Sequence, residues 1–323
     1  MHDDLSNEVL GNDESKNELQ ASSKRTRVPR FYSIFVGDDG LRAGWSVLLF
    51  VMFFMLMNRG MRAVLDRFPS LTLPDPITPG IGILQEGCTL LVILAATAVM
   101  AAIEGRRVAD YGYAANDKIK RLASGAGIGF VCLSVLVGVL WAAGFLVFDG
   151  RDLGGFAALE YGVIWAFGFV VVGLVEESLL RGYLQFTLAR GVGFWWAALI
   201  LSLLFALGHL GNSGESRMGL VAVFVGGLVF SLCLWYTKSL WWGIGFHAGW
   251  DWAQSYFYGT PDSGLLVADH FLKEHAVGRT LWSGGTVGPE GSLFLFPVLL
   301  LVAFGMWMWW GRVGRAPNTD PTA

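Results

Sequence analysis

The sequence predicts an all-α protein, a polytopic bundle of about eight transmembrane helices around a buried cavity. Hydrophobic residues make up 54% of the 323 residues and glycines number 43. Together they reach roughly two thirds of the chain, whereas soluble globular domains average about 45–50%. The apolar residues also form continuous runs without the period-two alternation of a membrane β-barrel. This composition excludes a soluble enzyme, a nucleic-acid-binding protein and a disordered scaffold.

Eight apolar runs have the length of a membrane-spanning helix, which is roughly 17 to 25 residues. They lie near residues 43–60, 82–103, 123–148, 158–178, 192–211, 218–237, 239–257 and 292–311. The first run is bracketed by Arg42 and Arg59. Because arginine side chains can extend to the lipid headgroups, this helix is expected to continue past Arg59. The fourth and seventh runs contain ionisable residues.

The runs and the polar segments between them divide the chain into five parts. The parts are a disordered cytoplasmic tail (1–40), the first two helices (41–104), a core of helices three to seven (105–257), an extracytoplasmic loop (258–291), and the last helix with its tail (292–323). The first segment has acidic and then basic residues and few large apolar ones, which is typical of disorder and unlike a signal peptide.

The positions of lysine and arginine predict the orientation. With a cytoplasmic N-terminus and alternating helices, 16 of the 23 basic residues fall on the cytoplasmic side and 7 on the other side. Cytoplasmic loops of membrane proteins carry the excess of lysine and arginine. Both termini are therefore expected in the cytoplasm. The net charge of -3 indicates no general attraction to nucleic acid.

A few ionisable residues fall inside the apolar runs, where a charge costs about 3 kcal/mol and is a functional candidate by default. They are Glu86, Glu176, Glu177, Arg181, His209, His247 and Asp251. Glu86 lies near the start of the second run and is expected at the membrane interface, with a position on the cavity wall as the alternative. The other six residues form three groups.

The first group lies in GLVEESLLRGYLQ, residues 173–185. Glu177 and Arg181 are four residues apart, so they share a helical face in the order that favours an ion pair. Glu176 is rotated by about 100° and has no local cation. The alternative interpretation is an interfacial cluster that only closes the helix end.

The other two groups each contain a histidine. His209 follows Phe205 by four residues, and a structural histidine bonded to a backbone carbonyl is an equally good interpretation. His247 and Asp251 are also four apart, so the carboxylate can accept from the imidazole N–H and set its tautomer. The alternative is a buried pair that holds two helices together.

A carboxylate, two imidazoles and exclusion of bulk water together favour hydrolysis of an amide. The carboxylate acts as general base on water, and imidazole donors or a metal stabilise the oxyanion. The sequence contains neither the H-E-x-x-H spacing of a soluble-type metalloprotease helix nor the G-x-S-x-G element of a serine hydrolase.

Three motifs in this order resemble those of the CPBP intramembrane proteases. They are Glu176-Glu177-x-x-x-Arg181, Phe205-x-x-x-His209 and His247-x-x-x-Asp251. The family includes the CAAX-processing type II prenyl endopeptidases and the bacterial Abi proteins linked to bacteriocin self-immunity. The resemblance covers about residues 105–257, and the basic segment 106–112 is similar to one that often precedes the family's core.

The resemblance implies an endopeptidase that cleaves a peptide bond at or within the membrane, in the setting of a bacterial inner membrane. It implies that Glu176 activates the attacking water and that Glu177 and Arg181 form an orienting ion pair. His209 would hold the water or a metal, and His247 with Asp251 would stabilise the oxyanion. Phe205 would pack beside the site. The implied partners are membrane lipid and a peptide or protein substrate, whose identity stays open, as does the oligomeric state.

Two points of the resemblance are open. The prenyl endopeptidases typically carry asparagine where this chain has Asp251, and an ionised aspartate cannot donate to an oxyanion, so Asp251 is expected to orient His247. Metal use is also open. Glu176, His209 and His247 could supply three ligands of Zn²⁺ or another divalent metal, with water as the fourth, and the alternative is a glutamate-activated water without a metal.

Two other classes of function compete with a protease. One is a non-catalytic immunity or chaperone-like membrane protein that binds a partner in the same cavity. The other is a proton-coupled transporter, since intramembrane glutamate and histidine also serve proton relays. A transporter predicts paired half-repeats, and none is visible in the sequence.

Overall fold

A computed structural model of the protein describes residues 32–37 and 40–311. The chain divides into two units, Met1–Arg42 and Ala43–Ala323. The described part of the first unit is helix α2 (Tyr32–Phe35) and two antiparallel strands, β1 (Val36–Gly37) and β2 (Gly40–Leu41). Most of the predicted N-terminal tail and the predicted C-terminal tail lie outside the described residues.

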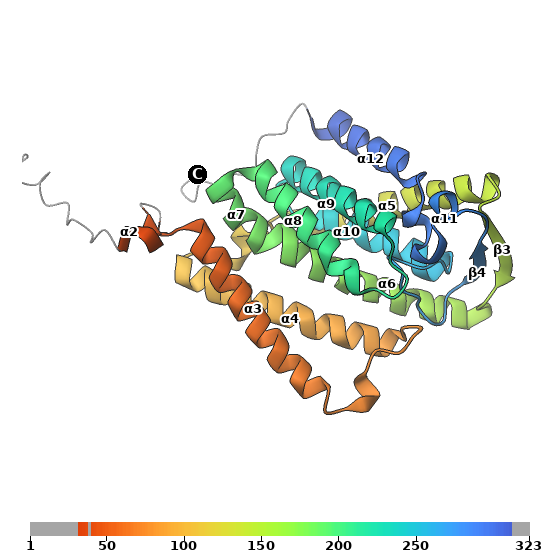
Figure 1. Ribbon diagram of the computed structural model, residues 1–323, viewed down its shortest axis with the longest axis horizontal. Helices are drawn as coiled ribbons and strands as arrows, with labels where there is room; N and C mark the ends of the chain where they lie inside the picture. Colours follow the sequence, from red (N-terminus) through yellow and green to blue (C-terminus); the bar gives the residue numbers. More distant parts are fainter. Residues whose placement is uncertain (1–31, 38–39, 312–323) are drawn as a thin grey trace, which may run out of the picture. The chain divides into compact units, whose positions relative to one another are not determined.

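The second unit is a bundle of long apolar helices (Figure 1), as the sequence predicts. Its elements are α3 (Ala43–Leu65), η1 (Pro69–Leu71), α4 (Pro79–Glu104), η2 (Val108–Asp110), α5 (Lys118–Ala142), β3 (Leu146–Arg151), α6 (Gly155–Glu177), η3 (Ser178–Leu184), α7 (Gln185–Val192), α8 (Phe194–Gly208), η4 (His209–Gly211), α9 (Arg217–Thr237), α10 (Trp241–Asp251), η5 (Trp252–Phe257), β4 (Leu272–Ala276), α11 (Thr280–Ser283), η6 (Gly285–Val287), η7 (Pro289–Gly291) and α12 (Leu295–Trp310).

Six helical segments of the described residues are long and apolar enough to cross a membrane. They are Ala43–Leu65, Pro79–Glu104, Lys118–Ala142, Gly155–Val192, Phe194–Gly211 and Arg217–Thr237. The first continues past Arg59, as expected. The segments at the seventh and eighth predicted positions, α10 with η5 and α12, are shorter. The protein is therefore an integral, multi-pass membrane protein, and the number of eight spans stays a prediction.

The third run differs from its predicted range of 123–148, because its helix ends at Ala142. Gly144 has a left-handed φ of 78°, a conformation that glycine adopts without steric cost. The residues that follow form strand β3, which pairs antiparallel with β4. Hydropathy alone did not mark this boundary, since the strand continues with apolar residues.

Helices α5 and α10 pack closely because glycines meet the facing backbone. A Cβ atom added to Gly129 would lie 2.2 Å from the carbonyl oxygen of Phe246, and one added to Gly249 would lie 2.1 Å from that of Ala126. Backbone atoms cannot rotate away as side chains can, so only glycine permits this approach. The contact sets the position of α10, which carries His247 and Asp251.

Gly129→Val is therefore expected to force α5 and α10 apart. Overpacking of a core typically costs about 1–3 kcal/mol, and a backbone clash falls at the upper end. Gly127→Val is the matched control, because a Cβ atom there would have no neighbour within 4 Å. Thermal unfolding in detergent should show a large drop in Tm for the first variant and little change for the second. Equal Tm values for both variants would contradict the close contact.

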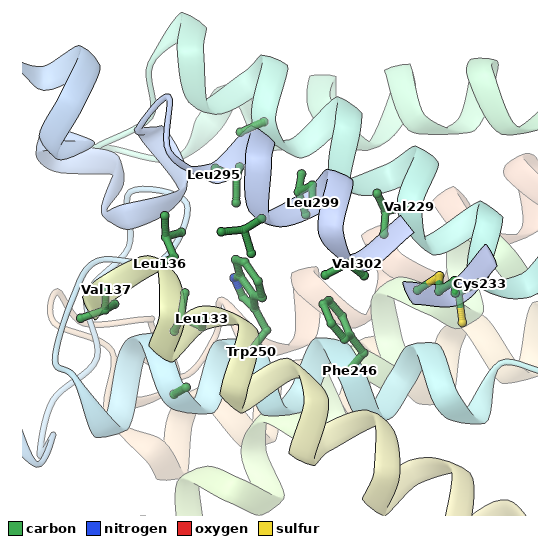
Figure 2. Packing of buried hydrophobic residues seen from close by; sticks show 14 of the residues in the cluster. Leu133, Leu136, Val137, Val229, Cys233, Phe246, Trp250, Leu295, Leu299 and Val302 are labelled. Atoms are coloured by element: carbon green, nitrogen blue, oxygen red, sulfur yellow. The ribbon is translucent and has the colours of Figure 1, made fainter. Parts of the chain in front are cut away.

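The apolar core beside the site joins four helices (Figure 2). Phe246 and Trp250 of α10 pack with Leu133 of α5, Val229 of α9 and Leu299 of α12. All five side chains are less than a tenth exposed. Burying a large apolar side chain stabilises a fold by about 1.5–3 kcal/mol. The core therefore supports α10 on the side away from α6.

Candidate active site

Two π-helical segments adjoin the residues singled out by the sequence. α6 ends at Glu177 and continues as the π-helix η3, in which Gly182 departs from helical geometry with φ -80° and ψ -124°. α10 ends at Asp251 and continues as the π-helix η5. π-helical turns are rare and occur frequently at functional sites. Spacing rules for a regular α-helix do not reveal them.

Glu177 and Arg181 form a buried ion pair, as their spacing predicts. Arg181 Nη1 lies 3.1 Å from Glu177 Oε1, and the two side chains are 1% and 2% exposed. Arg181 Nη2 also donates to the carbonyl oxygen of Gly227 at 3.1 Å. The guanidinium carbon lies 4.7 Å from the ring centre of Phe205 and 5.2 Å from that of Phe230. The charge is therefore enclosed by a carboxylate, a carbonyl and two aromatic faces.

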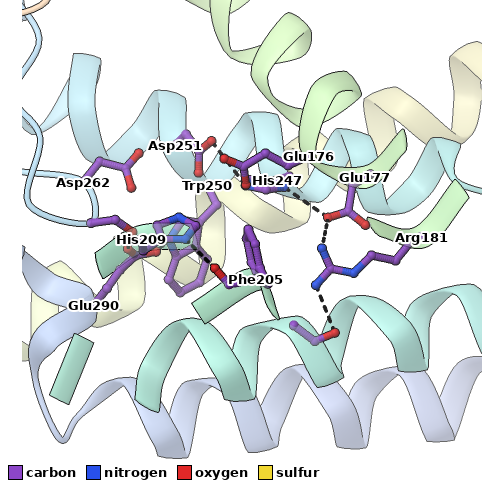
Figure 3. Close-up of polar contacts among 12 residues, drawn as sticks. Glu176, Glu177, Arg181, Phe205, His209, His247, Trp250, Asp251, Asp262 and Glu290 are labelled. Carbon is purple, nitrogen blue, oxygen red and sulfur yellow. Dashed lines mark hydrogen bonds and ion pairs between the residues drawn. The ribbon is translucent and has the colours of Figure 1, made fainter. Parts of the chain in front are cut away.

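His247 lies at the centre of the carboxylates (Figure 3). Its Nε2 is 3.2 Å from Glu176 Oε2 and its Nδ1 is 3.3 Å from Glu177 Oε1. The ring stacks on Phe230, with centroids 4.7 Å apart and planes 27° apart. Since ionised carboxylates only accept hydrogen bonds, both ring nitrogens can donate here. The imidazole is thus held as a donor in a fixed plane.

Asp251 is a more distant partner of His247 than either glutamate. Its Oδ2 lies 3.6 Å from His247 Nε2 and its side chain is 7% exposed. The sequence predicts that Asp251 orients this histidine, whereas in the structure Glu177 faces Nδ1 and Glu176 is the nearer group at Nε2. Asp251 also lines the cavity described below.

His209 stands apart from this cluster. Its Nδ1 lies 2.8 Å from the carbonyl oxygen of Phe205, so Nδ1 carries a proton. The rings of Phe205 and His209 meet edge to face at 4.8 Å. Among the described residues, His209 makes no hydrogen bond or ion pair with Glu176 or His247. The carbonyl bond fits the structural interpretation, while the side chain also lines the cavity.

A cavity of about 480 Å³ connects these groups. Glu176, His209, His247 and Asp251 all line it. The side chain of Glu176 is 27% exposed, whereas that of Glu177 is 2% exposed. Of the two adjacent glutamates, Glu176 is therefore the one that water in the cavity can reach. Glu86 also lines the cavity, which was the alternative to an interfacial position.

Sequence reasoning missed two cavity carboxylates in the segment after α10. Asp262 accepts from Ser255 Oγ at 3.2 Å, and Glu290 accepts from Trp250 Nε1 at 2.7 Å. Burial, with Asp251 and Glu290 nearby, raises the pKa of Asp262 well above its usual range. Charged residues in a long polar connection indicate a solvated loop, so nothing in the sequence marks this segment as part of the cavity wall.

The predicted metal ligands do not form a zinc site in this arrangement. A catalytic zinc needs three protein ligands around one point. Over residues 40–311, no group of three or more histidine, cysteine, aspartate or glutamate side chains is arranged to hold a metal ion. Glu176 and His247 are adjacent, but His209 does not join them. We therefore derive no catalytic step through a metal.

Fold and site together define a multi-pass membrane protein in which ionisable side chains from several helices meet at a cavity. Residues 158–253 match the family model of the Rce1-like type II CAAX prenyl endopeptidases. The match confirms the resemblance of this segment to the CPBP/CAAX protease family. It contains all three motifs. No curated protein matches the chain.

Proposed function

We propose that the protein is an intramembrane endopeptidase that hydrolyses a peptide bond with a water molecule activated by Glu176. The observation that carries the proposal is the contrast between the adjacent glutamates. Glu176 is open to the cavity and touches His247, whereas Glu177 is buried against Arg181. One carboxylate can thus exchange protons with water while the other is paired with Arg181 and structural.

The proposed reaction follows from these contacts. Glu176 takes a proton from water while the oxygen attacks the carbonyl carbon of the scissile bond. His247 donates from Nε2 to the oxyanion that forms, since Glu177 and Arg181 hold its ring in place. Glu176 then returns the proton to the amide nitrogen, and the C–N bond breaks. Nε2 of His209, which has no hydrogen-bond partner among the described residues, can accept from the water.

The test compares histidines inside and outside the cavity. Purified protein in liposomes is given libraries of membrane peptides, with and without a prenyl group. His247→Ala is expected to lower the cleavage rate about 10²–10³-fold, the typical loss for an oxyanion donor. His275→Ala is the matched control, because that side chain is 56% exposed on strand β4. If His247→Ala still performed the protein's function in living cells as well as the unmodified protein does, that would favour a binding-only protein over a protease.

Metal dependence is tested separately. Because Glu176 and His247 contact each other directly and no third ligand joins them, the proposed reaction needs no metal ion. Dialysis against EDTA is expected to leave the cleavage rate unchanged, with less than one equivalent of zinc in the purified protein. Loss of activity on dialysis, restored by Zn²⁺, would overturn this part of the proposal.

A further inference from the structure

Four connections lie together at one end of the bundle, which we call the cavity end: residues 66–78, 143–154, 209–216 and 258–294. The last connection contacts each of the others. Ile77 bridges to Val267, the Asn212 side chain donates to the carbonyl oxygen of Ser263 at 2.8 Å, and β3 pairs with β4. Figure 1 shows β3, β4 and α11 at this end.

The opposite end, which we call the basic end, holds residues 105–117, 190–193 and 238–240. Leu240 N donates to Gly112 O at 2.9 Å, and Arg190 Nη2 lies 3.0 Å from Glu104 Oε1. Helix α3 starts at this end, since Ala43 adjoins Gly191. Helix α12 finishes there, since Trp310 meets Trp242 at 5.3 Å.

The connecting segments that line the cavity are those of the cavity end and not those of the basic end. Every residue from a connecting segment that lines it comes from that end: Leu73, Ile77, His209, Asn212, Asp262, Ser263, Leu265, Val267 and Glu290. No residue of 105–117, 190–193 or 238–240 lines it. Toward the basic end, the Glu177–Arg181 pair and a buried cluster that includes Phe194, Leu240 and Ile244 fill the bundle.

The two ends differ in their share of basic residues. Helix α3 begins and helix α12 ends at the basic end, and the sequence before α3 and after α12 contains no apolar run that could cross a membrane. The basic end, these segments and the first turn of α5 with Lys118, Lys120 and Arg121 hold 15 of the 23 lysines and arginines. The cavity end, the last two turns of α3 with Arg59 and Arg62, and the first residue of α9, Arg217, hold 7, and Arg181 is buried in between. Basic residues near membrane helices are retained on the cytoplasmic side. The basic end therefore corresponds to the cytoplasmic side.

We propose that the active-site cavity opens away from the cytoplasm, so that the substrate is a peptide segment at the extracytoplasmic face of the membrane. The substrate part of this inference rests on the proposed function. It excludes a lipid-modified C-terminus presented from the cytoplasm, because the buried Glu177–Arg181 pair and the cluster beneath it separate Glu176 from the basic end. The segments that would meet such a substrate first are 66–78 and 258–294, which lie outside the matched family segment.

The orientation can be measured without any catalysis. A chain with Cys88, Cys132 and Cys233 replaced by alanine receives one cysteine, either Leu265→Cys at the cavity or Asn116→Cys at the basic end. A membrane-impermeant maleimide is added to intact bacterial cells and to permeabilised cells. Both positions are exposed. We expect Leu265→Cys to react in intact cells and Asn116→Cys to react only after permeabilisation. The reverse pattern would overturn the proposal.

A second variant tests the orientation even if the cysteine-free chain fails to fold. Val277→Cys, exposed at the end of the β4 segment, is made with the three natural cysteines retained, and the unmodified chain gives the background. Labelling above that background in intact cells is expected. Labelling only after permeabilisation would overturn the inferred orientation.

The substrate side is then tested in sealed vesicles whose orientation has been determined by labelling. A peptide that the detergent-solubilised protein cleaves is added outside vesicles with the cavity end outward. We expect these vesicles to cleave the peptide without permeabilisation. Vesicles of the opposite orientation are expected not to cleave it. Cleavage only in the opposite orientation would overturn the inference. Absence of cleavage in detergent as well would refute the proposed function, whereas the labelling result would still report the orientation.

Discussion

Replacing Glu176 with glutamine is expected to lower kcat for peptide cleavage by about 10²–10⁴-fold, the usual contribution of a general base. Glutamine has nearly the same shape and can still accept a hydrogen bond from His247 Nε2, now 3.2 Å from Glu176 Oε2. It cannot take up a proton from water. The fold and KM should therefore change little. The rate is measured with the reconstituted protein at saturating peptide.

Glu86→Gln is the matched control, since Glu86 also lines the cavity but contacts neither His247 nor Arg181 in the described structure. We expect this variant to keep kcat within a few-fold of the unmodified protein. A Glu176→Gln variant as active as Glu86→Gln would show that Glu176 is not the base. Equal losses in both would mean that the negative charge of the cavity, rather than one positioned carboxylate, sustains the reaction.

Arg181→Met is expected to destabilise the bundle by about 3–5 kcal/mol, the cost of leaving one member of a buried ion pair alone. Glu177 is 2% exposed, so water cannot replace the lost guanidinium. The carbonyl of Gly227 and the faces of Phe205 and Phe230 would lose their cation as well. Thermal or denaturant unfolding in detergent measures the loss.

The control is an ion pair with the same four-residue spacing that lies at the surface. Arg121 pairs with Asp117 at 2.6 Å, also four residues apart, but the side chains are 31% and 48% exposed. Exposed pairs contribute little because water solvates either partner alone. Arg121→Met should therefore change Tm much less than Arg181→Met. The double variant Glu177→Gln/Arg181→Met should recover part of the stability, since it leaves no unpaired charge. Equal loss in the two single variants would contradict the role of burial.

The sequence was sufficient for features that depend on neighbours along the chain. The apolar runs predict the long helices because hydrocarbon requires about 20 apolar residues and internal hydrogen bonds. The spacing of Glu177 and Arg181 predicts their ion pair, because residues four apart share a helical face. It also separates Glu176 from that pair, in agreement with the different exposure of the two glutamates.

Contacts between helices were beyond the sequence. Glu177 meets His247 across 70 positions of the chain. The sequence predicts only Asp251 as a partner of that histidine. Phe230 supports both His247 and Arg181 from α9, a helix without Asp, Glu, Lys, Arg or His in its apolar core. No motif within that helix could indicate this role, because stacking depends on how two helices are rotated and spaced.

The sequence by itself determined that the chain lies in a lipid bilayer, where its long helices run, and which residues carry charge into the membrane. The tertiary structure decided which glutamate faces the cavity, which groups hold His247, and that Asp262 and Glu290 close the cavity from the connection after α10. The physical reason is that helix formation and ion pairs four residues apart depend on local geometry. The depth of a side chain and its partner on another helix depend on packing, such as the glycine contacts between α5 and α10.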